Sequence, residues 1–221
     1  MPRLLLTAGP TREPIDAVRF IGNRSSGRMG LAIASAAADA GWSTTLLLGP
    51  GPEPPAGPIS TIRFETTEQL SALLNAHWPD HDVLIMAAAV ADERPAGGPL
   101  TGKQTRGSAR TLALEPTPDL LESLTPMTRD DQYRVGFALE TPDRLVERAR
   151  EKLACKSLNA IVANPLDTME SDSVDARLIL CTGEEISAPE GIDKATFAGW
   201  LLKQITTQLP HIDGRKTISS G

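Results

Sequence analysis

Short apolar runs alternate with amphipathic segments along most of this chain. Residues 3–8 are leucine-rich, as in a buried strand, and residues 25–42 are rich in Ala, Ile and Leu, as in a core-facing helix. Residues 82–90 are almost all apolar, which is typical of a strand buried on both faces of a parallel sheet. The same patterns predict strands at 44–48, 59–64, 111–114, 133–139 and 160–163, and helices at 66–77, 119–124 and 143–156.

This order of strands and helices predicts an α/β fold of Rossmann-like, three-layer αβα type with a mostly parallel sheet. After Ala176 the pattern changes, because 178–181 and 185–187 flank a Thr-Gly turn and predict a C-terminal β-hairpin, followed by a helix over 193–209. Residues 91–108 are glycine-rich and are expected to form a long, functional or mobile loop. In such a sheet, ligands bind at the carboxyl ends of the strands.

Composition narrows the class of protein. The chain has 221 residues, of which 40% are apolar and 23% charged, so a packed core is expected. We expect one domain over 1–209 and a polar tail over 210–221. The longest apolar run is too short for a membrane span, and the amino terminus lacks a secretory apolar region. Two cysteines predict no disulfide framework and favour a cytoplasmic location.

Charge is distributed unevenly. The net charge of −6 argues against nucleic-acid binding, yet four arginines lie between Arg12 and Arg28. The turn at Gly9 and the helix start at Ser25-Ser26-Gly27 offer free backbone N–H groups and a positive helix dipole, which suit a phosphate. The alternative is that a serine caps the helix and the glycines only permit close packing. The arginines favour the phosphate site, although the spacing matches neither the dinucleotide fingerprint nor the phosphate loop of nucleotide triphosphatases.

Several motifs carry a more specific resemblance. The stretch AGPTREPIDAVRFIGNRSSGRMG is followed, in order, by AAAVADERP at 87–95, GFALET at 136–141 and IVAN at 161–164. Together these resemble phosphopantothenoylcysteine synthetase, the ligase of coenzyme A synthesis that is often fused behind a flavin-dependent decarboxylase. The resemblance implies that residues 1–209 form a single nucleotide-binding ligase domain.

The resemblance also implies a reaction and its partners. The carboxylate of 4′-phosphopantothenate attacks the α-phosphate of CTP and releases pyrophosphate, and the amine of L-cysteine then displaces CMP from the acyl-cytidylate. Mg²⁺ is expected with the triphosphate, and flavin is not. A homodimer paired through the hairpin region at 176–187 is expected, with a separate phosphopantothenoylcysteine decarboxylase downstream and neither nucleic acid nor membrane as partner.

Residues acting on the acyl group follow from the same resemblance. Asn23 matches the family's asparagine that orients the acyl-cytidylate, and its alternative is a residue needed only for the turn. Arg19 matches an arginine on the phosphopantothenate side, where a guanidinium pairs with oxyanions. Arg24 and Arg28 remain equally well explained as solvated charges.

The resemblance also implies which residues contact the nucleotide. They lie in the first glycine turn, at the start of the first helix, after the central strand, around the base and at the end of a later helix: Gly9, Ser25, Ser26, Gly27, Asp92, Thr117, Pro118, Asp119, Phe137 and Lys156. Asp92 would bind ribose, the cytosine amine or a metal, and a cap of the next turn is an equal alternative. By pattern alone, Phe137 would be a core residue. Lys156, like Lys152 before it, also suits the carboxyl end of a helix.

One departure concerns the mobile loop, where the family usually has K-x-K-K. Here the stretch is Leu100-Thr101-Gly102-Lys103, so Lys103 is the catalytic lysine that remains. If this single cation does not reach the phosphates, the chain is a catalytically impaired nucleotide-binding relative. A third hypothesis is a Rossmann-type reductase that uses NADPH. Whether the nucleotide is CTP or ATP is left open.

Overall fold

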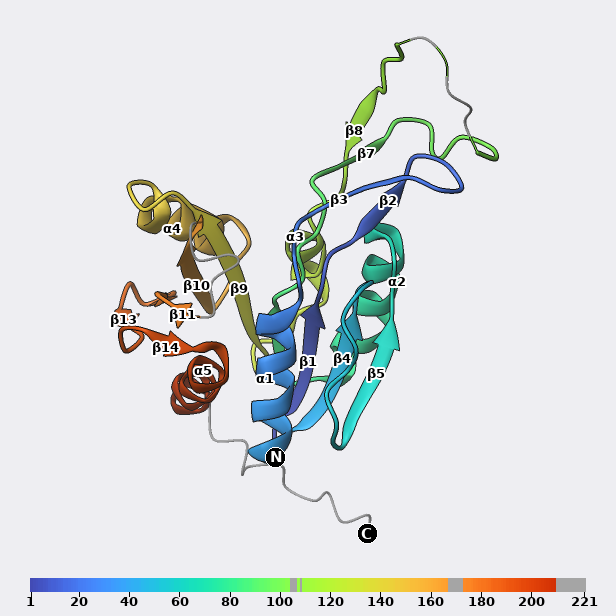
Figure 1. Ribbon diagram of the computed structural model, residues 1–221. Helices are drawn as coiled ribbons and strands as arrows, with labels where there is room; N and C mark the ends of the chain where they lie inside the picture. Colours follow the sequence, from blue (N-terminus) through green and yellow to red (C-terminus); the bar gives the residue numbers. More distant parts are fainter. Residues whose placement is uncertain (104–106, 108, 167–172, 210–221) are drawn as a thin grey trace.

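The computed structural model describes residues 1–103, 107, 109–166 and 173–209 and has three layers around a central sheet (Figure 1). Within this part of the chain the sheet has eight strands in the order β13-β12-β10-β9-β6-β1-β4-β5. The strands are β1 (Arg3–Ala8), β4 (Ser43–Leu48), β5 (Ile59–Arg63), β6 (Val83–Met86), β9 (Tyr133–Glu140), β10 (Ala160–Pro165), β12 (Arg177–Leu180) and β13 (Glu185–Ser187). The strands from β10 to β5 in this order run parallel to one another. The hairpin β12–β13 extends the sheet at one edge with antiparallel pairing.

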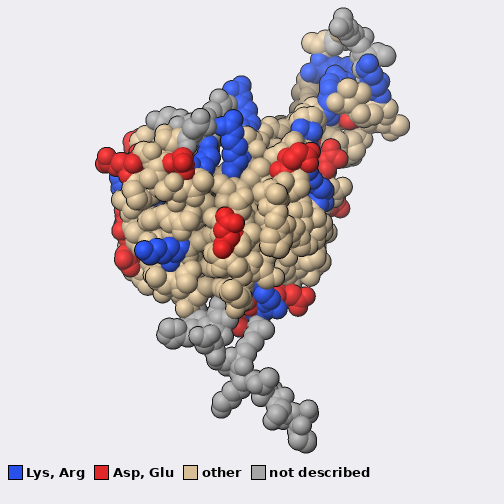
Figure 2. Space-filling model, turned by 60° about the horizontal axis from the view of Figure 1, so that its bottom comes forward, with Lys and Arg blue, Asp and Glu red and all other residues tan. Residues whose placement is uncertain are grey.

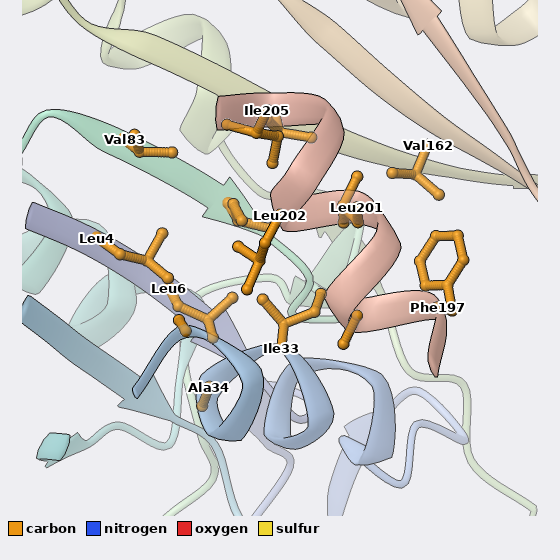
Figure 3. Close-up of a cluster of buried hydrophobic side chains, with 14 of the residues drawn as sticks. Leu4, Leu6, Ile33, Ala34, Val83, Val162, Phe197, Leu201, Leu202 and Ile205 are labelled. Carbon is orange, nitrogen blue, oxygen red and sulfur yellow. The ribbon is translucent and has the colours of Figure 1, made fainter. Parts of the chain in front are cut away.

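Helices cover both faces of the sheet. Helices α1 (Arg28–Asp39) and α5 (Lys194–Gln208) pack on one face, and α2 (Thr67–His77), α3 (Leu120–Ser123) and α4 (Leu145–Cys155) pack on the other. Leu201 and Leu202 of α5 meet Ile33 of α1 above Leu4 and Leu6 of the central strand (Figure 3). All five side chains are nearly or fully buried, so apolar burial stabilises the layered arrangement. The predicted Rossmann-like αβα fold with a C-terminal hairpin is therefore confirmed.

An arm projects from the body at the carboxyl ends of the strands (Figure 1). It consists of the paired strands β2 (Arg12–Pro14) and β3 (Phe20–Gly22) and the paired strands β7 (Glu93–Pro95) and β8 (Leu114–Pro116), with the described residues between the members of each pair. Two backbone hydrogen bonds join the two pairs: Leu100 N donates to Ile15 O at 2.9 Å, and Ala17 N donates to Gly102 O at 3.3 Å. Figure 2 shows positively charged side chains gathered on this arm, where the sequence carries Arg94, Lys103 and Arg110.

The remaining elements are short. Single-turn helices η1 (Trp78–Asp80) and η2 (Thr125–Met127) follow α2 and α3, and β11 (Ser173–Val174) pairs with β14 (Ile192–Asp193) before α5. Asp193 caps α5 by accepting from Thr196 N at 2.7 Å, which fixes the start of the predicted last helix. No helix among the described residues combines the length and the apolar character needed to cross a membrane.

Some predicted boundaries are wrong. The strand predicted at 82–90 ends at Met86, because the chain beyond it turns to pair with the residues after β1, where Ala89 N donates to Gly9 O at 3.0 Å. The predicted loop at 91–108 contains β7, and the strand predicted at 111–114 is found at Leu114–Pro116. Helix 143–156 is shorter by a few residues at its start and by one at its end.

The first helix begins at Arg28 and not at residue 25, and it ends at Asp39 and not at 42. Its N-cap is Gly27, with φ 71°, and no side chain caps the helix. The idea that Ser25 or Ser26 merely caps this helix is therefore wrong. A glycine N-cap brings no capping side chain, and the positive end of the helix dipole suits an anion. The predicted tail over 210–221 lies outside the described residues.

Candidate functional site

The strand order reverses beside β1. Strands β4 and β5 extend the sheet from one side of β1, whereas β6, β9 and β10 extend it from the other. At such a reversal the loops that leave the strand ends diverge and open a crevice. An open cleft of about 660 Å³ lies at this point, lined by residues that follow β6, by the end of β9 and by the neighbouring ends of α3 and α4.

The floor of the cleft is the alanine-rich segment 87–92 after β6. Two fully buried threonines hold it in place, since Thr7 Oγ1 accepts from Ala88 N at 3.1 Å and Thr11 Oγ1 accepts from Ala91 N at 2.9 Å. Small side chains keep the floor low, so a bound ligand can approach the backbone closely. The strand predicted at 82–90 ends at Met86, and the threonine hydroxyls hold the residues that follow it as the irregular floor of the cleft.

Asn23 joins the hairpin β2–β3 to that floor. It follows β3 directly, and its side-chain N–H donates to the carbonyl oxygen of Val90 at 3.0 Å. Asn23, Arg24 and Ser25 line both the cleft and a second hollow of about 470 Å³, which Arg12 also lines. Asn23 is therefore held at the border of the cleft by the backbone of its floor.

An ion pair forms the opposite wall. Asp119 is the N-cap of α3 and accepts from Leu121 N and Glu122 N, both at 3.1 Å, while Lys156 is the C-cap of α4. Lys156 Nζ lies 2.6 Å from Asp119 Oδ2. Burial disfavours the ionised carboxylate, but the bonds from Lys156 and the two N–H groups outweigh it and lower the pKa of Asp119. Asp119 is thus a carboxylate at neutral pH, and Lys156 beside it borders the cleft.

The start of α1 opens into a smaller hollow of about 110 Å³ that continues from the cleft. Ser25, Ser26 and Gly27 line it, and a Cβ added to Gly27 would lie 3.2 Å from the backbone of Gly9. This close approach brings two of the predicted nucleotide-binding glycines together. The hollow combines the amino-terminal end of α1, where the helix dipole is positive, with the serine hydroxyls, which is a suitable environment for phosphate oxygens.

Asn164 is a site residue that sequence reasoning named in a motif but gave no role. It lies in β10 near its carboxyl end and borders both the cleft and the smaller hollow. Its Oδ1 atom is buried and has no hydrogen-bond partner among the described residues. A buried acceptor without a partner costs free energy unless a ligand satisfies it. The sequence signal for Asn164 was a polar residue at the end of an apolar strand. Lys194 also borders the smaller hollow, and no sequence pattern pointed to it.

The structure brings most of the predicted residues to this region. The cleft itself is bordered by Asn23, Ser25, Asp92, Thr117, Pro118, Asp119, Phe137 and Lys156. Phe137 is only half-buried: it packs against the core and also borders the cleft, so both of its interpretations hold in part. Thr117 N donates to Asp92 O at 2.9 Å, which ties these two segments together at the base of the arm.

Two predicted residues lie away from the cleft, on the arm. Arg19 is in the turn between β2 and β3, where its half-exposed guanidinium pairs with the fully buried carboxylate of Asp16. Lys103 is exposed and follows Gly102, which contacts that same turn. Neither borders the cleft in this conformation of the chain.

The cleft was also expected to accept a metal through Asp92, whose side chain is exposed. Among the described residues, no three His, Cys, Asp or Glu side chains are grouped so that they could hold a metal ion. A hard cation bound mainly by phosphate oxygens needs only one or two protein carboxylates, and Asp92 at the cleft border fits that requirement.

Known proteins resemble the chain over nearly its full length. Residues 2–209 match the family described as DNA/pantothenate metabolism flavoprotein C-terminal domain. The coenzyme A biosynthesis bifunctional protein CoaBC of Vibrio vulnificus (strain CMCP6) is 37% identical over 212 residues, covering 94% of this chain and 53% of the relative. The homologous protein of Mycobacterium tuberculosis (strain ATCC 25618 / H37Rv) is 39% identical over 222 residues, with coverages of 94% and 52%. The chain thus spans about half the length of these curated relatives.

Solved structures share the fold. The crystal structure of the C-terminal domain of CoaBC has a TM-score of 0.79 at 38% identity, covering 94% of this chain and 95% of that one. A mutant of Cab2, H337A, in complex with phosphopantothenate-cysteine has a TM-score of 0.79 at 19% identity, covering 94% and 86%, and it supports the fold alone.

Proposed function

The chain belongs to the DNA/pantothenate metabolism flavoprotein C-terminal domain family, and from this premise we propose that it is a phosphopantothenate–cysteine ligase. The resemblance to phosphopantothenoylcysteine synthetases, first recognised in the motifs, is confirmed at the level of the family. The activity, its nucleotide and its partners are proposals for this chain.

The proposed reaction has two steps. A carboxylate oxygen of 4′-phosphopantothenate attacks the α-phosphorus of CTP, the bond to the β-phosphate oxygen breaks, and pyrophosphate leaves. The amine of L-cysteine then attacks the acyl carbonyl of the resulting acyl-cytidylate, CMP leaves, and the amine loses a proton as the amide forms. Catalysis of such phosphoryl chemistry depends mainly on positioning and charge neutralisation, which is what a cleft with fixed backbone and cationic walls can supply.

The arrangement of the cleft supports a division of roles. Phe137 offers an aromatic surface for the base, and Asp92 offers a carboxylate for ribose or for the cytosine amine. Thr117, Pro118 and Asp119 form the facing edge of the same cavity. The triphosphate would extend toward Gly27 at the start of α1, where backbone N–H groups and the helix dipole favour negative charge.

Lys156 would neutralise phosphate charge from the opposite wall, and Asn164 Oδ1 would accept from a ligand hydroxyl or amine. Mg²⁺, held by phosphate oxygens and Asp92, would add charge neutralisation when bound. Asn23 would orient the acyl carbonyl and the α-phosphate, since an amide donates and accepts without acting as a nucleophile. Arg19 and Lys103 would act from the arm on the phosphopantothenate and on the triphosphate.

The observation that carries the proposal is the convergence of Asn23, Phe137, Lys156 and the start of α1 on one cleft at the strand-order reversal. The test is a product assay with Mg²⁺, 4′-phosphopantothenate, cysteine and either CTP or ATP. The proposal predicts pyrophosphate, CMP and phosphopantothenoylcysteine with CTP. Tight CTP binding without CMP formation would instead indicate the impaired relative, and micromolar NADPH binding without competition from CTP would indicate a reductase.

The proposal extends to partners. In the part of the chain that the structure describes, no strand pairs with the outer edge of β13, which supports a homodimer formed through residues 176–187 by strand addition. Light scattering of the wild type and of a variant with proline in β13 would test this arrangement. A cytoplasmic location and a separate decarboxylase that consumes the product complete the proposal.

A further inference from the structure

Arg134 lies beneath the wall of the cleft without reaching it. It is in β9, three residues before Phe137, and only 2% of the residue is exposed. Each terminal nitrogen of its guanidinium has two acceptors. Nη1 donates to Leu121 O at 3.0 Å and to Thr125 Oγ1 at 3.3 Å, and Nη2 donates to Lys156 O at 3.0 Å and to Ser157 O at 2.7 Å.

These acceptors belong to two segments that are far apart in the sequence. Leu121 lies in α3, two residues after its N-cap Asp119, and Thr125 begins η2. Lys156 is the C-cap of α4. The guanidinium therefore ties the backbone on the Asp119 side of the wall to the backbone on the Lys156 side, and these are the two residues whose side chains meet at 2.6 Å.

The turn that follows Lys156 is held by Arg134 as well as by backbone bonds to α4. Ser157 has φ 49°, a left-handed conformation that is unfavourable for a residue with a Cβ. Arg134 holds it through the Ser157 carbonyl, and the Arg134 backbone exchanges further bonds with Asn159, whose Oδ1 accepts from Arg134 N at 2.8 Å. Asn159 N also donates to Arg134 O at 3.0 Å. The end of α4 is thus fixed to β9 on several sides.

Neutral acceptors hold the guanidinium of Arg134. Its hydrogen bonds go to three carbonyl groups and a hydroxyl, its Nε is buried without a partner among the described residues, and burial lowers the pKa of this guanidinium. A buried cation at the carboxyl end of a helix interacts favourably with the negative end of the dipole. A lysine has one ammonium group, so it cannot occupy the planar fork that spans two segments.

We propose that Arg134 is a positioning residue of the ligase: it sets the separation of the α3 and α4 ends and so holds Lys156 where its ammonium can receive the phosphates of the nucleotide. The inference rests on the proposed function, because it names the ligand of Lys156. Arg134 does not itself line the cleft and acts through Lys156.

A double-mutant cycle on CTP binding in the presence of Mg²⁺ tests the proposal. We expect Arg134→Lys and Lys156→Ala each to weaken CTP binding by about five- to tenfold, the range of one charge-assisted contact. The double variant should bind no more than about twofold weaker than Lys156→Ala alone, because Arg134 acts only through that lysine. Additive losses, or wild-type binding by Arg134→Lys, would overturn the proposal.

Two further measurements separate positioning from loss of stability. Gln132→Met removes the bonds from another buried polar side chain of the same chain segment, which donates to Trp78 O and His81 O, away from the cleft. This control should lower the melting temperature and leave CTP affinity within about twofold of the wild type. If Gln132→Met weakens CTP binding as much as Arg134→Lys does, the role of Arg134 is structural only.

The second measurement does not depend on nucleotide binding. Carboxyl NMR titration should show the pKa of Asp119 rising in Arg134→Lys, because a displaced Lys156 stabilises the carboxylate less. An unchanged Asp119 titration would show that the ion pair does not depend on Arg134, whatever the ligand. If the titration shifts while the wild type binds no CTP, the positioning effect stands and the proposed function fails.

Discussion

Asn23 donates its side-chain N–H to the carbonyl oxygen of Val90 at 3.0 Å, across 67 positions of the sequence. The bond joins the end of the β2–β3 hairpin to the cleft floor, so it fixes where the Asn23 amide meets a ligand. Removing the amide should leave the first half-reaction possible and impair the second. In Asn23→Ala we expect acyl-cytidylate to accumulate and phosphopantothenoylcysteine formation to fall by roughly 10²-fold, the usual loss for a group that orients a developing oxyanion.

Quenched-flow analysis of the nucleotide products would measure both effects. Asn75→Ala is the matched control, because the Asn75 amide also donates to a backbone carbonyl, that of Ser71 at 2.9 Å in α2. This control should react like the wild type. Normal product formation by Asn23→Ala would remove Asn23 from the mechanism.

Lys103 provides a second prediction. It is exposed on the arm and is the lysine that remains from the family's lysine-rich loop. If it reaches the triphosphate when substrates bind, Lys103→Ala should slow pyrophosphate release by at least about tenfold, because an ammonium–phosphate contact contributes roughly 1.5–3 kcal/mol.

A coupled pyrophosphate assay would measure this rate, with Lys203→Ala as the control for loss of an exposed lysine, here from α5. The control should keep the wild-type rate. An unchanged rate in Lys103→Ala would mean that this loop needs no cation in the first step, and the impaired-relative hypothesis would lose its motivation.

The parallel core was predictable because its signals are local. Leucine-rich β1, the apolar run of β6 and the amphipathic helices each carry the pattern of their own burial, so element type and order could be read directly. The arm could not be found in this way. Its strands are three residues long, and Leu100 and Ala17 hold them by backbone bonds between distant segments. Such bonds leave no periodic pattern in the side chains.

The site was predictable in part for a related reason. Most of the cleft residues came from the family resemblance, and the order reversal beside β1 brings them together. The helix start was misjudged because serines are preferred N-caps, whereas Gly27 takes the left-handed conformation itself. The roles of Asn164 and Arg134 could not be predicted from the sequence. A buried oxygen without a partner among the described residues, and a guanidinium shared by two segments, are properties of the packing.

Gly27 gives a third prediction, on the phosphate end of the cleft. Its φ is 71°, and a Cβ would lie 3.0 Å from the Pro52 ring and 3.2 Å from Gly9. Gly27→Ala should therefore lower the free energy of unfolding by about 2 kcal/mol and also displace the N–H groups that the proposal assigns to the triphosphate. We expect CTP affinity to fall by about tenfold or more.

Gly191→Ala separates the two effects. Gly191 has φ 67°, but nothing lies within 4 Å of an added Cβ, so this variant has the backbone strain without the contact. Denaturant unfolding should show about 1 kcal/mol of destabilisation for it, with CTP affinity unchanged by calorimetric titration. Equal loss of affinity in both variants would show that general destabilisation, and not the helix start, governs binding.

The last prediction concerns pH and the opposite end of the sheet, where His81 follows η1. Its Nδ1 lies 2.6 Å from His77 O and its Nε2 lies 2.9 Å from Thr45 Oγ1.

Burial lowers the pKa of His81 below 6.5, with Arg3 and His77 acting in the same direction and the His77 carbonyl opposing them. The unfolded chain therefore binds more protons than the folded chain once the pH falls below about 6.5, so the stability that comes from neutral His81 is present at higher pH and declines as the pH falls below that value. Scanning calorimetry should show the melting temperature falling over this interval, and His81→Gln should flatten the slope. His77→Gln keeps the carbonyl contact and should retain most of the slope, whereas a slope in His81→Gln equal to that of the wild type would assign the effect to other groups.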